Sequence, residues 1–383
     1  MIKLEGEKEM KIENLFMEIE KLGMDFYTGV PDSQLKALCD SLMNKYGVGE
    51  HHVIAANEGA AVGLAAGHYL ATGKPAVVYL QNSGIGNAVN PICSLVNDKV
   101  YAIPVLFVVG WRGEPGVHDE PQHIYQGEIT RELLDCLGIK NFVISKESTT
   151  EELAEDFAEI QKEFAIGHQC ALVVRKGALE TDLKMKYKND YTMSREDAVK
   201  LFVDYTKERD IVVSTTGKLS RELFEAREER GQGHEKDFLT VGSMGHSSMI
   251  AMGIAREKKD RKVFCLDGDG AVLMHLGSVA VAGTEKMDNF IHVLFNNGAH
   301  ETVGGLPTIS EKIDYLKIAE ACGYENIFTV KTEEELKGIF AKIYEAKGSV
   351  FLEVKTSLGS RADLGRPTTT PIQNKEAFME FLK

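Results

Sequence analysis

Residues 263–305, VFCLDGDGAVLMHLGSVAVAGTEKMDNFIHVLFNNGAHETVGG, contain the pattern that decides the predicted fold. Two short apolar runs, at 263–266 and 291–295, are typical of buried parallel strands. The first run leads into Gly-Asp-Gly and the second into Asn-Asn-Gly. Ligands bind at the carboxyl ends of strands in an open α/β sheet, so Asp269 and Asn297 are expected to approach each other there. A carboxylate and an amide oxygen suit Mg²⁺ or Ca²⁺ that carries a phosphate group.

The composition indicates a soluble globular protein, with 43% hydrophobic and 27% charged residues in a chain of 383. This length predicts about two domains. The net charge of −14 argues against nucleic acid as a partner. No apolar run reaches the roughly 18–20 residues that span a membrane, and the acidic N-terminal stretch is unlike a signal peptide. The six cysteines form no CxxC pair, so we expect reduced core residues and a cytoplasmic location.

Apolar runs, glycine-containing turns and helix-compatible segments alternate along the whole chain, which implies doubly wound parallel sheets. The first domain is predicted to cover residues 1–178 and the second 192–383. The charged stretch 179–191 lacks helical or strand periodicity and is the predicted linker. Ser194 followed by Asp197 is expected to open the first helix of the second domain. The fold class is therefore α/β, with two domains of similar size and layout.

Residues 271–295 place 25 residues between the Gly-Asp-Gly and the Asn-Asn. This arrangement resembles the cofactor motif of thiamine diphosphate-dependent enzymes. The resemblance implies a pyrimidine-binding domain followed by a diphosphate-binding domain, without the central third domain of many relatives. It also implies that Asp269, Asn297 and the main-chain carbonyl of Ala299 hold Mg²⁺. The simpler alternative is a pair of ordinary turns rich in glycine and asparagine.

Glu58 is the residue that the resemblance assigns to cofactor activation. Enzymes of this family place a glutamate against N1′ of the aminopyrimidine, where a shared proton lets the 4′-amino group deprotonate the thiazolium. Ala-Asn-Glu-Gly-Ala-Ala at 56–61 matches that pattern, with the glutamate after a predicted strand and before a small-residue helix. The alternative is a surface glutamate that stabilises a helix N-terminus.

The turn Gly242-Ser243-Met244-Gly245 resembles the one that supports the bent cofactor in this family. Met244 would lie between the two rings, although methionine is more often plain core filler. The carbonyl of Gly242 would accept a hydrogen bond from the 4′-amino group. Backbone donors for the diphosphate are expected in two further turns, at Thr216, Gly217, Gly270 and Ala271.

Several stretches are similar to the phosphonopyruvate decarboxylases, and the sulfopyruvate decarboxylases are a close alternative. The stretches are YTGVPDS (27–33), YLQNSG (79–84), GWRGEPG (110–116), HDEPQH (118–123), NGAHETVGG (297–305) and SRADLGRP (360–367). The resemblance implies conversion of 3-phosphonopyruvate to phosphonoacetaldehyde and CO₂, in the biosynthesis of phosphonates of the aminoethylphosphonate type. It further implies at least a homodimer, with active sites between subunits.

A dianionic phosphonate needs cationic or multiple N–H donors. The candidates are Arg112, Lys218, Arg361 and Arg366, each with a solvated surface side chain as the alternative. Asp32, which is also a candidate for substrate binding, is expected with His118 and His300 on strand-end loops, where these groups could move protons during the reaction. His123 is a weaker candidate. Relatives that act on uncharged 2-oxo acids use an adjacent His-His pair, but His51-His52 precedes the glutamate strand and does not match its position.

Two other classes remain as alternatives. A dinucleotide-binding dehydrogenase would share the sheet pattern, but residues 84–86 supply only a partial glycine motif, without its third glycine. A non-catalytic protein of the same fold would be expected to lack the cofactor residues. Glu58, Asp269 and Asn297 are all present, which favours an enzyme.

Overall fold

The computed structural model describes residues 10–383. The chain forms two compact units, Met1–Lys186 and Tyr187–Lys383, and passes from one to the other inside the range 179–191. Between Val174 and Arg195 the described chain forms no helix or strand beyond a single bridge from Glu180 to Lys11. The backbone N–H of Ile12 donates to the carbonyl of Glu180 at 3.0 Å. The start of the range predicted as a linker is therefore bonded to the first unit.

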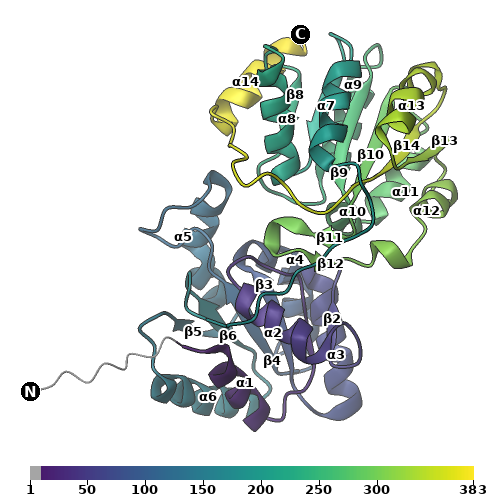
Figure 1. Cartoon of the computed structure of the whole chain (residues 1–383). Helices are drawn as coiled ribbons and strands as arrows, with labels where there is room; N and C mark the ends of the chain where they lie inside the picture. The colour runs from purple at the N-terminus through teal and green to yellow at the C-terminus, as the bar shows by residue number, and fades with distance from the viewer. Residues whose placement is uncertain (1–9) are drawn as a thin grey trace, which may run out of the picture. The chain divides into compact units, whose positions relative to one another are not determined.

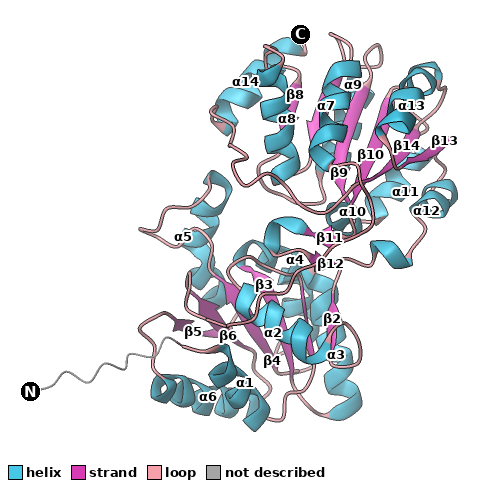
Figure 2. Ribbon diagram, viewed as in Figure 1, coloured by secondary structure: helices cyan, strands magenta, loops and turns pink. Residues whose placement is uncertain are grey.

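The first unit is built on a six-stranded parallel sheet with the order β2-β1-β3-β4-β6-β5 (Figure 2). Its strands are β1 Tyr27–Gly29, β2 His52–Ile54, β3 Ala76–Gln81, β4 Val105–Gly110, β5 Lys140–Ile144 and β6 Cys170–Val174. Its helices are α1 Ile12–Lys21, α2 Lys36–Tyr46, α3 Glu58–Thr72, α4 Ile85–Pro91, α5 Pro121–Cys136 and α6 Thr150–Ala165, with the short turns η1 Asn82–Gly84 and η2 Ile92–Val96. All six residues of β4 are buried, as expected for a parallel strand covered on both faces.

Two groups of helices cover this first sheet. Residues of α3, α4 and α5 pack with alternate residues of β3 and β4 in one hydrophobic cluster. Helix α1 contacts both α2 and α6, and none of the three contributes to that cluster, so these helices cover the opposite face. This doubly wound arrangement leaves the carboxyl ends of the strands free to carry polar loops.

The second unit repeats the architecture with a parallel sheet in the order β13-β14-β10-β9-β7-β8 (Figure 1). Its strands are β7 Ile211–Ser214, β8 Asp237–Leu239, β9 Val263–Gly268, β10 Phe290–Asn296, β13 Asn326–Val330 and β14 Val350–Lys355, with a separate pair β11 Ala299–His300 and β12 Leu306–Pro307. Its helices are α7 Arg195–Tyr205, α8 Lys218–Glu229, α9 Ser247–Glu257, α10 Asp269–Met274, α11 Gly277–Thr284, α12 Tyr315–Ala321, α13 Glu333–Glu345 and α14 Pro371–Phe381, with the short turns η3 Glu301–Val303 and η4 Ser310–Lys312. Helices α7, α8 and α13 share one hydrophobic cluster with the sheet, whereas α9, α11 and α12 do not take part in it.

These two sheets confirm the predicted α/β class with two doubly wound parallel domains. Ser194 caps α7 as predicted, since its side chain accepts from the backbone N–H of Asp197 at 3.0 Å. Strand β9 continues to Gly268 and α10 begins at Asp269 itself, so the Gly-Asp-Gly segment joins this strand directly to a helix.

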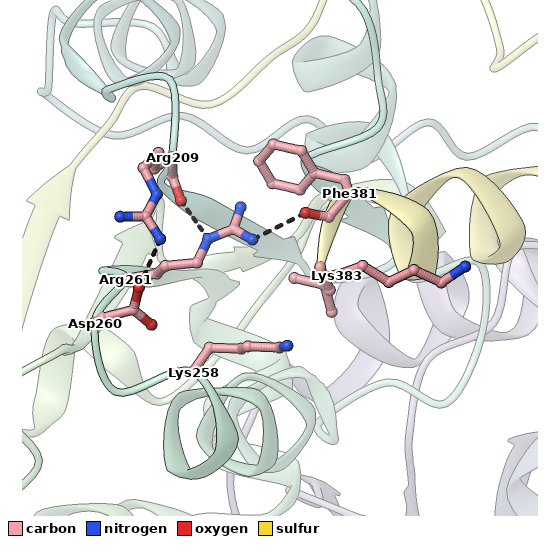
Figure 3. A pocket seen from close by; sticks show the side chains of 7 residues that line it. Arg209, Lys258, Asp260, Arg261, Phe381 and Lys383 are labelled. Carbon is pink, nitrogen blue, oxygen red and sulfur yellow. Dashed lines mark hydrogen bonds and ion pairs between the residues drawn. The ribbon is translucent and has the colours of Figure 1, made fainter.

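A cavity of about 250 Å³ in the second unit lies at the opposite edge of the sheet from Asp269. It is lined by Arg209, just before β7, by Lys258, Asp260 and Arg261, just before β9, and by the last residues of the chain (Figure 3). Arg261 donates to the carbonyls of Arg209 and Phe381 at 2.7 and 3.0 Å. These bonds tie α14 to the amino ends of the strands, so the cavity belongs to the packing of the chain end and not to the carboxyl edge.

Candidate active site

Glu58 is the first residue of α3 and is buried, with 5% of its surface exposed. Asn57 caps the helix by accepting from the backbone N–H of Ala60 at 2.8 Å. The side chain of Asn87, on α4, donates to Oε2 of Glu58 at 2.8 Å. Burial raises the pKa of Glu58, although the bond from Asn87 acts in the other direction. The alternative of an exposed helix-end charge is therefore excluded, and the carboxyl group is suited to holding a proton.

Gly84 makes room for this carboxyl group. A Cβ at Gly84 would lie 2.3 Å from Oε1 of Glu58, a distance that no side chain could occupy. Gly84 ends η1, directly after β3. The partial glycine motif at 84–86 thus has a steric function beside the glutamate, and Asn87 and Gly84 together fix the position of Glu58.

A second polar cluster lies at the carboxyl ends of β1, β3 and β4. Asp32 is fully buried and accepts from Nε2 of Gln81 at 2.6 Å and from the backbone N–H of Gln34 at 3.0 Å. Burial raises the pKa of Asp32, while the hydrogen bonds and the nearby Arg112 oppose that rise. Gly110 lies at the end of β4, and a Cβ at this position would be 2.2 Å from Oδ2 of Asp32. The prediction that Asp32 lies on a strand-end loop is confirmed.

Arg112 extends this cluster toward the surface. Its Nε donates to Asp119 Oδ2 at 2.7 Å, its Nη2 donates to the other oxygen of the same carboxylate, and its Nη1 donates to Ser33 Oγ at 3.2 Å. The guanidinium is thus oriented by a bidentate partner. His118 lies exposed on the loop that carries Asp119 and lines a cavity of about 280 Å³.

In the second unit, Asp269 is buried at the N-terminus of α10. The hydroxyls of Thr308 and Ser310 donate to its Oδ2 at 2.6 and 2.8 Å. Burial raises the pKa of Asp269 to about 6. Asn297 follows β10, whose register pairs Phe295 with Gly268, so both residues lie at the same sheet edge, as predicted.

The glycine-containing turns of the second unit gather around Gly270. A Cβ at Gly270 would lie 3.0 Å from Nδ1 of His300 and 3.2 Å from Cε of Met244. His300 is buried, and burial lowers its pKa to about 4. Met244 is half-buried and therefore not plain core filler. The turn 242–245, the Gly-Asp-Gly segment and the strand β11 are thus brought together.

Residues after β7 complete this half of the site. Gly217, with φ of 92°, precedes α8, and a Cβ there would lie 3.1 Å from Cγ2 of Thr302. Thr216 donates its hydroxyl to the carbonyl of Val241 at 2.6 Å. Within the described chain, the hydroxyl of Thr215 is buried and has no hydrogen-bond partner. An orphaned buried donor beside glycine turns, with hard oxygen donors at Asp269, fits a bound diphosphate and its divalent metal.

Two family models match this chain, one to each unit. The N-terminal thiamine pyrophosphate-binding domain of thiamine pyrophosphate enzymes matches residues 12–135, and the C-terminal domain matches residues 215–354. A phosphonopyruvate decarboxylase of Streptomyces viridochromogenes is 32% identical over 380 residues, which cover 94% of this chain and 92% of that protein. The chain belongs to the thiamine diphosphate-dependent decarboxylases. Glu58 lies in the first matched segment, and Asp269 and Asn297 lie in the second.

Other members of this decarboxylase family are also similar. A sulfopyruvate decarboxylase of Methanosarcina acetivorans is 25% identical over 95% of this chain and 94% of its own length. A sulfopyruvate decarboxylase subunit beta of Methanocaldococcus jannaschii is 33% identical and covers 49% of this chain with 97% of its own length. The family assignment removes the dehydrogenase and the non-catalytic protein as alternatives.

The candidate phosphonate-binding side chains of this decarboxylase differ in their ion pairs and exposure. Lys218, at the start of α8, lies 3.4 Å from Oε1 of Glu301. Arg361 is exposed and forms ion pairs with Glu196 and Glu225 on the outside of α7 and α8. Arg366 is exposed on the same tail segment. Arg112, Lys218 and Arg361 are therefore each already paired with a carboxylate.

Two further histidines of the first unit lie outside the predicted catalytic set. His52 is buried and bonded through its two ring nitrogens to the hydroxyl of Tyr79 at 2.8 Å and the carbonyl of Gly47 at 2.7 Å. His123 is half-buried, and burial together with Arg112 lowers its pKa to about 4. The second residue of the His-His pair is therefore held inside the core by two hydrogen bonds.

Several residues of the site were missed by the sequence reasoning. Thr308 directly follows β12 and Ser310 begins the short turn η4, so no sequence periodicity points from either residue to Asp269. Asn87 was read only as part of a helix, and its contact with Glu58 depends on how α3 and α4 pack. The only sequence signal for Asn87 is its position as a polar residue about one helical turn after the glycine turn at Gly84.

Proposed function

We propose that this enzyme decarboxylates 3-phosphonopyruvate to phosphonoacetaldehyde and CO₂, using thiamine diphosphate and Mg²⁺. The observation that carries the proposal is the 32% identity to a phosphonopyruvate decarboxylase across both units. A second protein of that name, from Streptomyces hygroscopicus, is 30% identical over 94% of this chain. The product is a building block for phosphonates of the aminoethylphosphonate type, which is the biosynthetic setting we propose.

Thiamine diphosphate, when bound, supplies the electron sink that decarboxylation of a 2-oxo acid requires. Glu58 would share its proton with N1′ of the aminopyrimidine, a role that suits a buried carboxyl with a raised pKa. Asp269, Asn297 and the carbonyl of Ala299 would hold Mg²⁺. The remaining contacts would come from the turns around Gly270, with backbone donors to the diphosphate at Thr216, Gly217, Gly270 and Ala271, and contacts to the rings at Gly242, Ser243 and Met244.

The phosphonate would be held by cationic side chains that follow the carboxyl ends of strands, Arg112 after β4 and Lys218 after β7. Arg112 presents a guanidinium already oriented by Asp119, and Lys218 has 28% of its side chain exposed. Both can donate charge-assisted hydrogen bonds to a dianion. Arg361 and Arg366 remain secondary candidates.

Proton transfer to the product would involve Asp32, His118 or His300. Asp32 and His300 are buried with pKa values moved toward their neutral forms, so the first can donate a proton and the second can accept one. His118 is exposed on its loop. Among the three, buried Asp32 is the strongest candidate because it lies beside Arg112.

The protein is proposed to act as at least a homodimer in the cytoplasm. The active sites would then lie between subunits, with the pyrimidine half from one and the diphosphate half from another, as the resemblance implies. No described helix is both long and apolar enough to cross a bilayer. All six cysteines are unpaired, as expected of a reducing compartment.

The decisive experiment measures CO₂ release by the purified protein with Mg²⁺ and thiamine diphosphate, on phosphonopyruvate, sulfopyruvate and pyruvate in parallel. A preference of at least tenfold in kcat/KM for phosphonopyruvate supports the proposal. A preference for sulfopyruvate would keep the chemistry and replace the substrate. That alternative is favoured by the end-to-end similarity to a sulfopyruvate decarboxylase at 25% identity. The absence of turnover on all three substrates would contradict both.

A further inference from the structure

A buried ion network lies behind Asn297 in the second unit. Arg195, the first residue of α7, donates to both oxygens of Glu222 at 2.7 Å. The same guanidinium donates to the two oxygens of Glu301 at 3.1 and 3.3 Å. Arg195 and Glu222 are 7% and 1% exposed. The position of Glu301 is therefore held by the guanidinium of Arg195, which is itself held by its two bonds to Glu222.

Glu301 is also bonded to the amide of Asn297, four residues earlier in the chain. Nδ2 of Asn297 donates to Oε2 of Glu301 at 2.7 Å. An ionised carboxylate only accepts hydrogen bonds, so it must face the NH₂ end of the amide. If the amide of Asn297 were rotated by 180°, its oxygen would face the carboxylate of Glu301, and neither group could donate a hydrogen bond. The carboxylate of Glu301 thus holds the NH₂ end of Asn297. The other end, Oδ1, accepts from the backbone N–H of Ala299 at 3.1 Å and keeps a second lone pair for a cation.

Orientation of this amide matters to a divalent metal. Mg²⁺ takes oxygen ligands and has strict geometry, so an amide that presents NH₂ would repel it. Groups that orient metal ligands without touching the metal commonly contribute to affinity. Lys218, 3.4 Å from the second oxygen of Glu301, adds a link between this carboxylate and the start of α8.

We propose that Glu301 is a positioning residue for the metal, which holds Asn297 with its oxygen directed at the cation and is anchored in turn by Arg195. The inference rests on the proposed function, because it takes Asn297 as a metal ligand. Arg195 stays paired with Glu222 when Glu301 is removed, so the loss of Glu301 leaves no unpaired charge in the core. The fold is therefore expected to tolerate the change.

The test measures Mn²⁺ binding to the apoprotein with thiamine diphosphate by electron paramagnetic resonance, in Glu301→Ala and Glu301→Gln. Glu301→Ala is expected to raise the metal Kd about 10–100-fold, the range typical of residues that orient metal ligands. Glu301→Gln keeps an oxygen acceptor and should lie between Glu301→Ala and the wild type. Glu320→Gln, an exposed residue on α12, is the charge-matched control and should bind like the wild type.

Kinetics separate positioning from a general structural effect. The Mg²⁺ concentration for half-maximal activity should rise in Glu301→Ala in parallel with the Kd, while kcat at saturating Mg²⁺ stays close to that of the wild type. Unchanged metal affinity with a lowered kcat or melting temperature would overturn the inference. If Glu301→Ala does not fold, Glu301→Gln decides: weaker metal binding than Glu320→Gln supports the role, and equal binding refutes it.

Asp269→Ala distinguishes failure of this inference from failure of the proposed function. Loss of metal binding in Asp269→Ala with wild-type affinity in Glu301→Ala would refute the role of Glu301 alone. Wild-type affinity in Asp269→Ala would show that the metal lies elsewhere, which would remove the proposed site together with the inference built on it.

Discussion

The substitution Glu58→Gln tests the role of the buried glutamate with little change in shape. Glutamine has the size of glutamate, so the packing against Gly84 and the contact with Asn87 should remain. What is lost is the ability to exchange a proton, which for a positioned acid–base group contributes about 10²–10⁴-fold in rate. At about 1.36 kcal/mol per factor of ten, this is about 3–5 kcal/mol of barrier. We expect kcat to fall by that factor, with thiamine diphosphate still bound.

The same substitution has a stability effect of defined sign. Burial raises the pKa of Glu58 above its ordinary value of 4.5, so between these two pKa values the folded protein holds more protons than the unfolded chain. The wild type therefore loses stability as pH rises through this window, at about 1.4 kcal/mol for each pKa unit of elevation. Glu58→Gln lacks this loss, so its stability relative to the wild type should increase as pH rises above about 4.5.

The assay combines CO₂ release with urea unfolding of the apoprotein at several pH values. Glu132→Gln, on the exposed part of α5, is the control and should change neither quantity. Unchanged kcat in Glu58→Gln would refute the assignment of the proton-sharing role. A stability difference that does not vary with pH would refute the claim that the buried carboxyl resists ionisation.

Three further substitutions test the surroundings of the site. Asp269→Ala should abolish retention of thiamine diphosphate after dialysis, and full retention would count against its role as a metal ligand. Gly84→Ala should lower kcat by about 10²-fold, because the added Cβ displaces the carboxyl of Glu58 and a shift of 1 Å can cost that much. The matched control is Gly86→Ala, whose Cβ would meet no atom within 4 Å. Arg112→Gln should raise the KM for phosphonopyruvate about 10–100-fold, in line with loss of a charged hydrogen bond, and should leave the KM for pyruvate unchanged. An equal effect on both substrates would contradict phosphonate binding by Arg112.

The sequence was most informative where strands end. Asp269 and Asn297 could be paired in advance because apolar runs locate parallel strands, and parallel strands end at one edge. Glu58 followed from the same logic together with the family resemblance. Its burial could not be derived, since a glutamate at a helix start is usually exposed. That burial depends on Gly84 and Asn87, which approach it only when α3 packs beside η1 and α4.

The network of Glu301, Arg195 and Glu222 shows why the remaining part of the site escaped the sequence reasoning. These three residues lie on η3, α7 and α8, separated by up to 106 positions along the chain. Each has the pattern of a surface charge in its own segment, and only packing of the three elements converts them into a buried network. Charged residues that act through other residues carry no local periodicity, so the structure is needed to find them.

The two units should be separable as polypeptides. Each has its own six-stranded sheet and its own hydrophobic cluster. The boundary between Lys186 and Tyr187 lies in a stretch, 181–194, that contributes to no helix or strand. A domain with a complete core can in principle fold alone. We expect residues 1–186 and 187–383, produced separately, each to unfold cooperatively when followed by circular dichroism.

Glu58 lies in one half and Asp269 in the other, so under the proposed function neither half alone should release CO₂. Once the connection is cut, assembly of a site that needs both halves depends on the bulk concentration of each half. Activity of the mixture should therefore appear only as both halves are raised together, and it should reach the level of the intact chain at saturation. Activity from either half alone would show that its carboxylate suffices, which would contradict the proposal that both Glu58 and Asp269 are required. A half that fails to unfold cooperatively would show that its core depends on the other.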